Sequence, residues 1–295
     1  MRRWIQRTHL AGLVALTLTA CAPGEHVPVG RGIAVTDDAG RRVTLAAPAR
    51  RVVSLLPSFT EILFAIGAGD RLVGRTTWCD YPPEALAVPS VGDGMPPSVE
   101  AVAARHPDLV VLYRSGPNVA AAEQLERLGI RTVLFDLNLL EQLGPVARRL
   151  GKLAGREAQA ESLATEMDRV ISQPPVPGTQ SLAFIVWDNP PIVIGAGSYL
   201  DRLAALAGAR NAFHDVSSPS AQVSIETIAA RDPDFVALLT DSAVPPRYAT
   251  RPEWRVVRAV RTARFLFLPG QLFGRPGPRA AEAIRELRRR LEAAP

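Results

Sequence analysis

Short apolar runs alternate with segments of helical periodicity along most of this 295-residue chain. Arg51–Leu56 and Leu109–Leu112 are apolar enough to form buried strands, and Leu139–Leu150 repeats its apolar residues at helical spacing. Strands that alternate with helices over short turns are typical of a largely parallel sheet covered on both faces. The alternation returns in the second half of the chain, where we expect strands at Leu182–Trp187, Phe235–Leu239 and Arg264–Leu268.

One phrase of the sequence occurs twice. Residues 98–112 (SVEAVAARHPDLVVL) return 126 positions later as residues 224–238 (SIETIAARDPDFVAL). In each copy a serine that can cap a helix precedes an apolar-periodic run, a proline ends that run, and a buried strand follows. A single echo at this distance indicates two similar lobes rather than a solenoid, whose repeats are about 20 to 50 residues long.

Each copy also carries an acid in the first turn of its helix, Glu100 in the first and Glu226 in the second. A carboxylate at that position complements the helix dipole by about 0.3–1 kcal/mol and needs no further role. Alternatively, two lobes each present an equivalent acid to one outside partner. The residues by themselves do not decide between these two interpretations.

A long segment without helix breakers separates the two halves. Residues 156–173 place apolar side chains at helical spacing, and the run Pro174–Gly178 then ends the segment. We therefore expect an α/β protein whose two similar lobes, with mainly parallel sheets, are joined by one long α-helix and hinge little. Ligands of such sheets bind beyond the carboxyl ends of the strands, which predicts a cleft between the lobes. The expected ranges are an N-terminal lobe at 32–150, the linking helix and its proline-rich stop at 151–178, and a C-terminal lobe at 179–295.

The first residues of the chain have the pattern of an export signal. A basic head precedes the apolar run Leu10–Leu18, which is too short to span a bilayer, and small residues follow. The four residues that end in Cys21 resemble the lipobox of bacterial lipoproteins, in which the cysteine is lipidated and becomes the new N-terminus. We therefore expect a lipoprotein signal peptide at 1–20, a tether at 21–31, and a membrane-anchored protein in the periplasm. An ordinary cleaved signal with an incidental cysteine is the alternative.

Composition restricts the classes of function. With 47% hydrophobic and 21% charged residues the chain is typical of soluble globular proteins. Its formal net charge of +5 falls to +2 when Arg2, Arg3 and Arg7 leave with the signal peptide, which disfavours a nucleic-acid partner. Lipidation of Cys21 leaves Cys79 as the remaining cysteine, so an intrachain disulfide is not expected.

Motifs of catalysis are missing from the sequence. It contains no Gly-x-Ser-x-Gly elbow, no phosphate-binding loop and no dinucleotide fingerprint after a strand. We therefore expect no enzyme and no resident cofactor, although an exported α/β enzyme stays open as a remote alternative. The histidine content disfavours a zinc carrier, because zinc sites gather several histidines, and His26, His106 and His214 are separated in the mature chain.

Aromatic and polar side chains follow several of the expected strands. Core aromatics usually lie inside elements, so aromatics just beyond strand ends point to a binding surface at the cleft. The residues that we expect to contact a ligand there are Trp78, Tyr81, Tyr113, Trp187, Gln271, Phe273 and Arg275.

The order of several short motifs resembles one family of transport proteins. These motifs are Ser58-Phe-Thr-Glu61, Cys79-Asp-Tyr-Pro-Pro83, the Glu100 helix with its strand, Asn189-Pro-Pro191 and the Glu226 helix. From about Arg51 to the C-terminus the chain is similar to a periplasmic substrate-binding protein of the single-helix-linked class. That class serves ABC importers of iron–siderophores, haem and vitamin B12. Within it, the chain looks most similar to the cobalamin-binding branch.

The resemblance implies roles for individual residues. Glu100 and Glu226 match the lobe-tip acids that pair with arginines on a permease dimer, which works with its ATPase subunits. Trp78 matches an aromatic residue of the cobalamin site, while Tyr113 and Trp187 replace a tryptophan and a phenylalanine there. The segment Gln271–Arg275, in which Phe273 and Arg275 match most directly, falls on another stretch that contacts the ligand. The resemblance also implies a monomer, whose cargo is a small metallo-macrocycle or chelate.

Two departures leave the cargo open. Gly94 and Ser220 stand where the cobalamin binder has further tryptophans, which implies a roomier or less aromatic cavity. A ferric siderophore, with Arg114, Arg275 and Arg279 facing an anionic chelate, is therefore an alternative. Haem is another, with Tyr113 or Tyr81 as the iron ligand.

Overall fold

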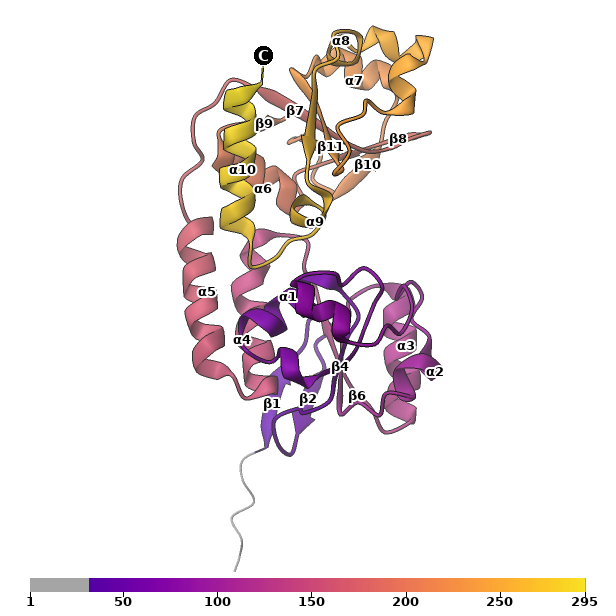
Figure 1. Cartoon of the computed structure of the whole chain (residues 1–295), viewed down its shortest axis with the longest axis vertical. Coiled ribbons are helices and arrows are strands. Elements are labelled where there is room, and N and C mark those ends of the chain that lie inside the picture. The colour runs from indigo at the N-terminus through magenta and orange to yellow at the C-terminus, as the bar shows by residue number, and fades with distance from the viewer. Residues whose placement is uncertain (1–31, 295) are drawn as a thin grey trace, which may run out of the picture. The chain divides into compact units, whose positions relative to one another are not determined.

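The strands of the chain form two main sheets, one in each half of the sequence (Figure 1). The computed structural model describes residues 32–294, so the predicted signal peptide, Cys21 and the tether lie outside the described residues. Within the described range no helix is both long and apolar enough to cross a membrane.

The first lobe has the parallel sheet that the sequence predicts. The order of its strands is β4-β3-β5-β6, and every neighbouring pair is parallel. A hairpin precedes this sheet, with β1 antiparallel to β2. The strands are β1 (Ile33–Thr36), β2 (Arg42–Leu45), β3 (Val52–Ser54), β4 (Leu72–Arg75), β5 (Leu109–Tyr113) and β6 (Arg131–Phe135). The α-helices are α1 (Pro57–Ala65), α2 (Val99–Ala103), α3 (Gly116–Arg127) and α4 (Leu143–Ala154).

Helices cover both faces of this sheet because successive strand residues point to opposite sides. Val111 packs into the cluster that contains residues of α1 and α4, whereas Val110 and Leu112 pack into the cluster formed with α2 and α3. Figure 1 shows α1 and α4 on one side of the sheet and α3 on the other. This two-sided burial explains why β5 is an uninterrupted apolar run.

The segment between the sheets is a helix of 15 residues, α5 (Glu157–Ile171). It packs along α4, since Gly151 of α4 leaves no room for a Cβ beside Ala160 of α5. Its buried residues belong to a hydrophobic cluster that also takes in α1 and α4 of the first lobe and α6 (Tyr199–Ala207) and α10 (Ala280–Ala293) of the second. The lobes thus share one continuous core, and α4 ends four residues beyond the predicted lobe boundary at 150.

The second lobe also has a mainly parallel sheet, with an antiparallel edge that was not expected. Its sheet has the order β10-β8-β7-β11-β12, with β9 paired to β7. Strands β7, β9, β11 and β12 are parallel, but β8 is antiparallel to β7 and β10 is antiparallel to β8. The strands are β7 (Ser181–Asp188), β8 (Pro191–Ile194), β9 (Arg210–Asn211), β10 (Ser220–Gln222), β11 (Phe235–Leu239) and β12 (Phe265–Leu268). The cause is a hairpin turn at Asn189 and Pro190, which the sequence analysis treated as a loop.

Smaller elements complete the second lobe and the connections. A 3-10 turn that begins at Pro252 is followed by a short α8, and the segment after β12 contains the short α9. These α-helices are α7 (Ile225–Arg231), α8 (Arg258–Arg261) and α9 (Gly270–Phe273). The 3-10 helices are η1 (Gly69–Arg71), η2 (Pro83–Ala87), η3 (Leu140–Gln142), η4 (Arg247–Thr250) and η5 (Pro252–Val256).

The two copies of the repeated phrase adopt the same local structure. Ser98 Oγ accepts a hydrogen bond from the backbone N–H of Ala101, and Ser224 Oγ accepts one from Thr227, both at 3.2 Å. Each copy then leads into an interior strand of its sheet, β5 or β11. The aspartate that precedes the strand in each copy also has an equivalent role. Asp108 and Asp234 each accept hydrogen bonds from backbone N–H groups at the start of the neighbouring strand.

Candidate functional site

A cavity of about 450 Å³ lies where the two lobes meet. That volume is within the range of small-molecule sites. Its walls come from segments that follow β3, β4, β5 and β6 of the first lobe and β12 of the second, which is the strand-end position that the sequence predicts. The lining residues are Leu56, Pro57, Ser58, Trp78, Asp80, Met95, Tyr113, Leu137, Asn138, Gly270, Gly274, Arg275 and Pro276.

Large apolar side chains form much of the cavity wall. Trp78 is 61% exposed and Met95 is 79% exposed, although both are residues that normally bury most of their surface. Tyr113 lies at the end of β5 and donates its hydroxyl to Oδ1 of Asn138 at 2.9 Å. Exposed apolar groups around a concave site are suited to the broad faces of a flat ligand.

Ser58 supplies a polar group that has no partner among the described residues. Its side chain is 1% exposed, and its Oγ makes no hydrogen bond there. Helix α1 begins at Pro57, so Ser58 is inside the first turn and caps nothing. A buried hydroxyl without a partner costs about 1–3 kcal/mol, and a hydrogen bond to a bound ligand or water would offset that cost.

Asp80 and Arg275 are the charged residues of the lining, and they pair with each other. Arg275 Nη2 lies 2.8 Å from Asp80 Oδ1, so the pair joins the second lobe to the first. Gln271 Nε2 donates to the other carboxylate oxygen at 3.1 Å, and Arg275 Nη1 donates to the backbone carbonyl of Trp78. Each charged side chain among the described lining residues is therefore paired with a side chain of opposite charge.

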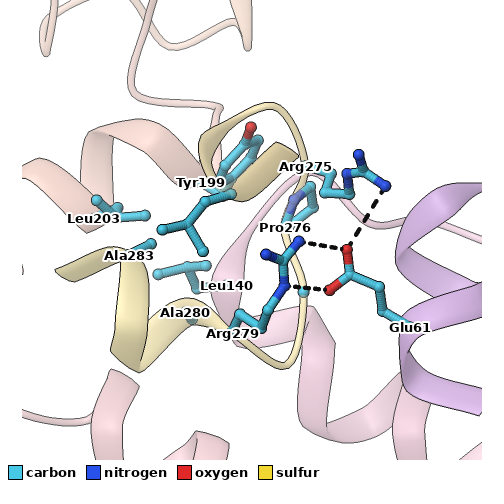
Figure 2. Close-up of a pocket in the computed structure, with 11 residues that line it drawn as sticks. Glu61, Leu140, Tyr199, Leu203, Arg275, Pro276, Arg279, Ala280 and Ala283 are labelled. Carbon is cyan, nitrogen blue, oxygen red and sulfur yellow. Dashed lines mark hydrogen bonds and ion pairs between the residues drawn. The ribbon is translucent and has the colours of Figure 1, made fainter. Parts of the chain in front are cut away.

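A second set of ion pairs lies behind this wall (Figure 2). Glu61 of α1 accepts two hydrogen bonds from Arg279, and its Oε1 lies 3.7 Å from Arg275 Nη1. Burial would lower the pKa of Arg279, but the hydrogen bonds that Arg279 donates to Glu61 and the neighbouring negative charges raise that pKa above its ordinary value. The seam here holds a void of only about 10 Å³, which is room for at most one water.

Three of the seven predicted ligand contacts line the cavity, namely Trp78, Tyr113 and Arg275. Tyr81 instead lies under Arg279, whose guanidinium carbon is 3.7 Å from the ring centroid, and Gln271 supports Asp80 from outside the lining. Trp187 lies on the β7–β8 hairpin, where its Nε1 donates to the backbone carbonyl of Asn189. Contact of these residues with a ligand stays a prediction.

For Phe273 the structure contradicts the expectation. Its side chain is fully buried in the core cluster that includes α6 and α10, so it does not line the cavity. The reason is the short helix α9, which ends at Phe273, and whose last carbonyl accepts a hydrogen bond from Tyr199. Burial raises the pKa of Tyr199, which keeps this donor protonated.

The sequence analysis did not identify Ser58, Met95 and Asn138 as lining residues. Ser58 and Asn138 closely follow β3 and β6, so the rule that placed Tyr113 at the cleft applies to them as well. The backbone at position 94, next to Met95, favours glycine over a tryptophan. The φ of Gly94 is +81°, and a Cβ at this position would lie 2.7 Å from Thr76 Cγ2.

The repeated acids lie on different lobes, each at the start of a short helix. Glu100 is in α2 of the first lobe and Glu226 is in α7 of the second, and both side chains are exposed. Hydrogen bonds from its own backbone and from Ser224 hold the pKa of Glu226 below its usual range, which favours the charged carboxylate. Ser98 Oγ lies 3.3 Å from Glu100 Oε2 in the equivalent arrangement.

The remaining metal-binding candidates are dispersed. Within residues 32–294 no group of three or more histidine, cysteine and acidic side chains is placed to hold a metal ion. His214 pairs with Asp201 at 2.9 Å. Cys79 is buried beside Thr76, with its Sγ 3.1 Å from Thr76 Oγ1. His26 lies outside the described residues.

Comparisons with known proteins agree with this architecture. The family model of the periplasmic binding proteins matches residues 52–272. A vitamin B12-binding protein of Pectobacterium carotovorum subsp. carotovorum (strain PC1) is 29% identical over 251 residues, which cover 83% of this chain and 89% of that protein. The ABC transporter substrate-binding lipoprotein YvrC of Bacillus subtilis (strain 168) is also 29% identical, over 269 residues, which cover 86% of this chain and 84% of that protein. A solved periplasmic haem-binding protein from Pseudomonas aeruginosa superposes with a TM-score of 0.70 at 26% identity, over 84% of this chain and 94% of that one.

Proposed function

Because this chain belongs to the periplasmic binding protein family, we propose that it captures cobalamin or a related corrinoid and delivers it to an ABC permease. As a member of that family it is a substrate-binding protein of ABC transport and not an enzyme. One relative named above is a vitamin B12-binding protein and a solved one is a haem-binding protein, which supports a metallo-macrocycle or iron chelate as the cargo class.

The main support for a neutral cargo is that the charged side chains in and behind the cavity lining are paired with each other. Asp80 and Arg275 neutralise each other at 2.8 Å, and Arg279 behind them is held by Glu61. Arg114, the remaining arginine considered for an anionic chelate, is paired with Asp136. A ferric siderophore or the propionates of haem would require cations that are free to pair with the ligand. A neutral macrocycle requires none.

The shape and chemistry of the lining support the same choice. A corrin ring offers broad apolar faces and a polar rim of amides. Trp78 and Met95 supply exposed apolar surface for the faces, while Ser58 Oγ and the side chain of Asn138 supply polar groups for the rim. The shared core of the two lobes keeps these walls in place, which limits the entropy lost when the cargo binds.

Haem is the second candidate, because Tyr113 brings a phenol to the cavity wall and a relative binds haem. A phenolate that binds iron has to give up its proton. The Tyr113 hydroxyl donates a hydrogen bond to Asn138 Oδ1 at 2.9 Å, and this bond favours a hydrogen-bonded phenol over an iron ligand.

Delivery of the cargo requires a permease partner and a location at the membrane. Glu100 and Glu226 offer one carboxylate per lobe, for which arginines of a permease dimer with its ATPase subunits are suitable partners. Lipidation at Cys21 would anchor the protein, as a monomer, to a membrane that faces the periplasm, and one relative is named as a lipoprotein. The corrinoid would be bound as cargo, with no resident cofactor.

The cargo is tested by adding cyanocobalamin, haemin or a ferric tris-catecholate to the purified mature protein and recording visible difference spectra. We expect saturable binding of cyanocobalamin at one site per chain. Saturable binding of haemin or of the ferric catecholate without binding of cyanocobalamin would overturn the corrinoid proposal and leave the transport class intact.

A further inference from the structure

Glu61 is a buried acid that no part of the proposed cargo contact uses. Its side chain belongs to α1 of the first lobe and is 3% exposed, yet both of its ion-pair partners come from the second lobe. Arg279 donates from Nε to Oε2 at 3.0 Å and from Nη2 to Oε1 at 2.8 Å. Figure 2 shows this two-point contact, with Arg275 reaching the same carboxylate from the cavity side.

The surroundings fix both guanidinium groups. Arg279 also donates to the backbone carbonyl of Gln271 and lies over the ring of Tyr81. Arg275 is held between Glu61 and Asp80. The loop approaches so closely at Gly277 that a Cβ there would lie 3.2 Å from Glu61 Oε2. Two carboxylates and two guanidinium groups therefore form one closed network across the seam of the lobes.

The network makes the cavity wall neutral only while Glu61 carries its charge. Asp80 and Glu61 together offset Arg275 and Arg279. If Glu61 becomes uncharged, one positive charge is left behind the lining, where low solvent access weakens screening. An anionic ligand then gains attraction that a neutral ligand of the same shape does not.

We propose that Glu61 is a positioning residue that sets the charge selectivity of the cavity. It holds Arg275 in contact with Asp80, and it keeps Arg279 away from the cargo. The proposal rests on the function proposed above, since it takes this cavity as the cargo site. It goes beyond that function, because it assigns the preference for neutral cargo to a residue that does not touch the cargo.

Two corrinoids of matched shape and different charge test the proposal. Cobinamide carries amides at its rim, and cobyrinic acid carries carboxylates at the same places. The dissociation constants of both, in their dicyano forms, are measured for the full mature protein and for Glu61→Gln. We expect the preference of the wild type for cobinamide to fall by about tenfold in Glu61→Gln. Equal loss for both ligands, or no change in the preference, would overturn the proposal.

Rescue and control variants separate charge from folding. Glu61→Gln with Arg279→Gln restores the charge balance and should return the preference to that of the wild type. Glu166→Gln removes an exposed acid that pairs within α5, and should leave the preference unchanged. If Glu61→Gln does not fold, Arg279→Gln alone should strengthen the preference for cobinamide, and a weaker or unchanged preference would contradict the proposal.

Failure of the proposed cargo is distinguishable from failure of this inference. If the wild type binds neither corrinoid, the corrinoid proposal is wrong. The same variants are then compared with haemin and its uncharged dimethyl ester. Glu61→Gln should again shift the preference towards the anionic member of the pair, and an unchanged preference would overturn the role of Glu61.

Discussion

Arg275 of the second lobe donates to Asp80 of the first at 2.8 Å, and this contact forms part of the cavity wall. The two residues are 195 positions apart in the sequence. Their pairing joins the lobes and cancels the charges of the lining in one interaction. The same contact therefore belongs both to the joint between the lobes and to the lining of the proposed cargo site.

Replacement of Trp78 by alanine should weaken cargo binding by about 1–1.5 kcal/mol, or roughly five- to tenfold in Kd. The reason is loss of exposed aromatic surface at the cavity, while the free energy of unfolding should stay unchanged because the ring buries little surface in the free protein. Calorimetric titration and thermal melting measure the two effects. Leu86→Ala, which removes an exposed apolar side chain outside the lining, is the control. An unchanged Kd for Trp78→Ala would exclude the residue from the site.

Replacement of Phe273 by alanine should lower the free energy of unfolding by about 3–5 kcal/mol, because a fully buried ring leaves a cavity in the core. Urea denaturation measures the loss. Phe273→Leu fills most of the space and should retain cargo affinity. If Phe273→Ala kept its stability and lost only affinity, Phe273 would contact the ligand as the sequence suggested.

Replacement of Ser58 by alanine should weaken cargo binding by about 0.5–1.5 kcal/mol without lowering stability. The hydroxyl has no hydrogen-bond partner among the described residues, so its removal costs the free protein nothing. Ser54→Ala is the matched control, because the Ser54 hydroxyl accepts from Thr60 at 2.8 Å and its loss should lower stability instead. Unchanged cargo affinity in Ser58→Ala would mean that the hydroxyl binds water rather than cargo.

Reversal of charge at both Glu100 and Glu226, each to lysine, should reduce cargo uptake by cells at least about tenfold while the Kd for cargo stays unchanged. The two exposed carboxylates lie on different lobes, outside the cavity lining. Glu166→Lys with Glu292→Lys makes the same change of net charge on other exposed helical positions and should leave uptake normal. A parallel loss of cargo affinity in the Glu100 and Glu226 variant would assign these residues to ligand binding or folding.

Much of this fold follows from local patterns. The repeated phrase predicts equivalent helix caps and interior strands in both lobes because capping serines, prolines and apolar runs act within a few residues. The antiparallel β8 was missed because a short apolar run after two prolines resembles a loop until its pairing with β7 is known. Long-range pairing of this kind is not encoded in periodicity.

The site was predictable to a smaller extent. Trp78 and Tyr113, which were expected at the cleft because they follow strands, both line the cavity, and their contact with a ligand stays a prediction. Whether a side chain in such a loop turns outwards or into the core depends on the local helix that the loop forms, and α9 turns Phe273 inwards. The Glu61 network could not be foreseen, because it depends on how closely α1 and the loop before α10 approach each other.

We propose that the seam between the lobes holds a neutral corrinoid. Isothermal titration of the mature protein with cyanocobalamin should therefore show one site per chain, with a dissociation constant in the micromolar range or below that is higher in Trp78→Ala. No binding of cyanocobalamin, or binding that Trp78→Ala and Ser58→Ala both leave unchanged, would contradict it.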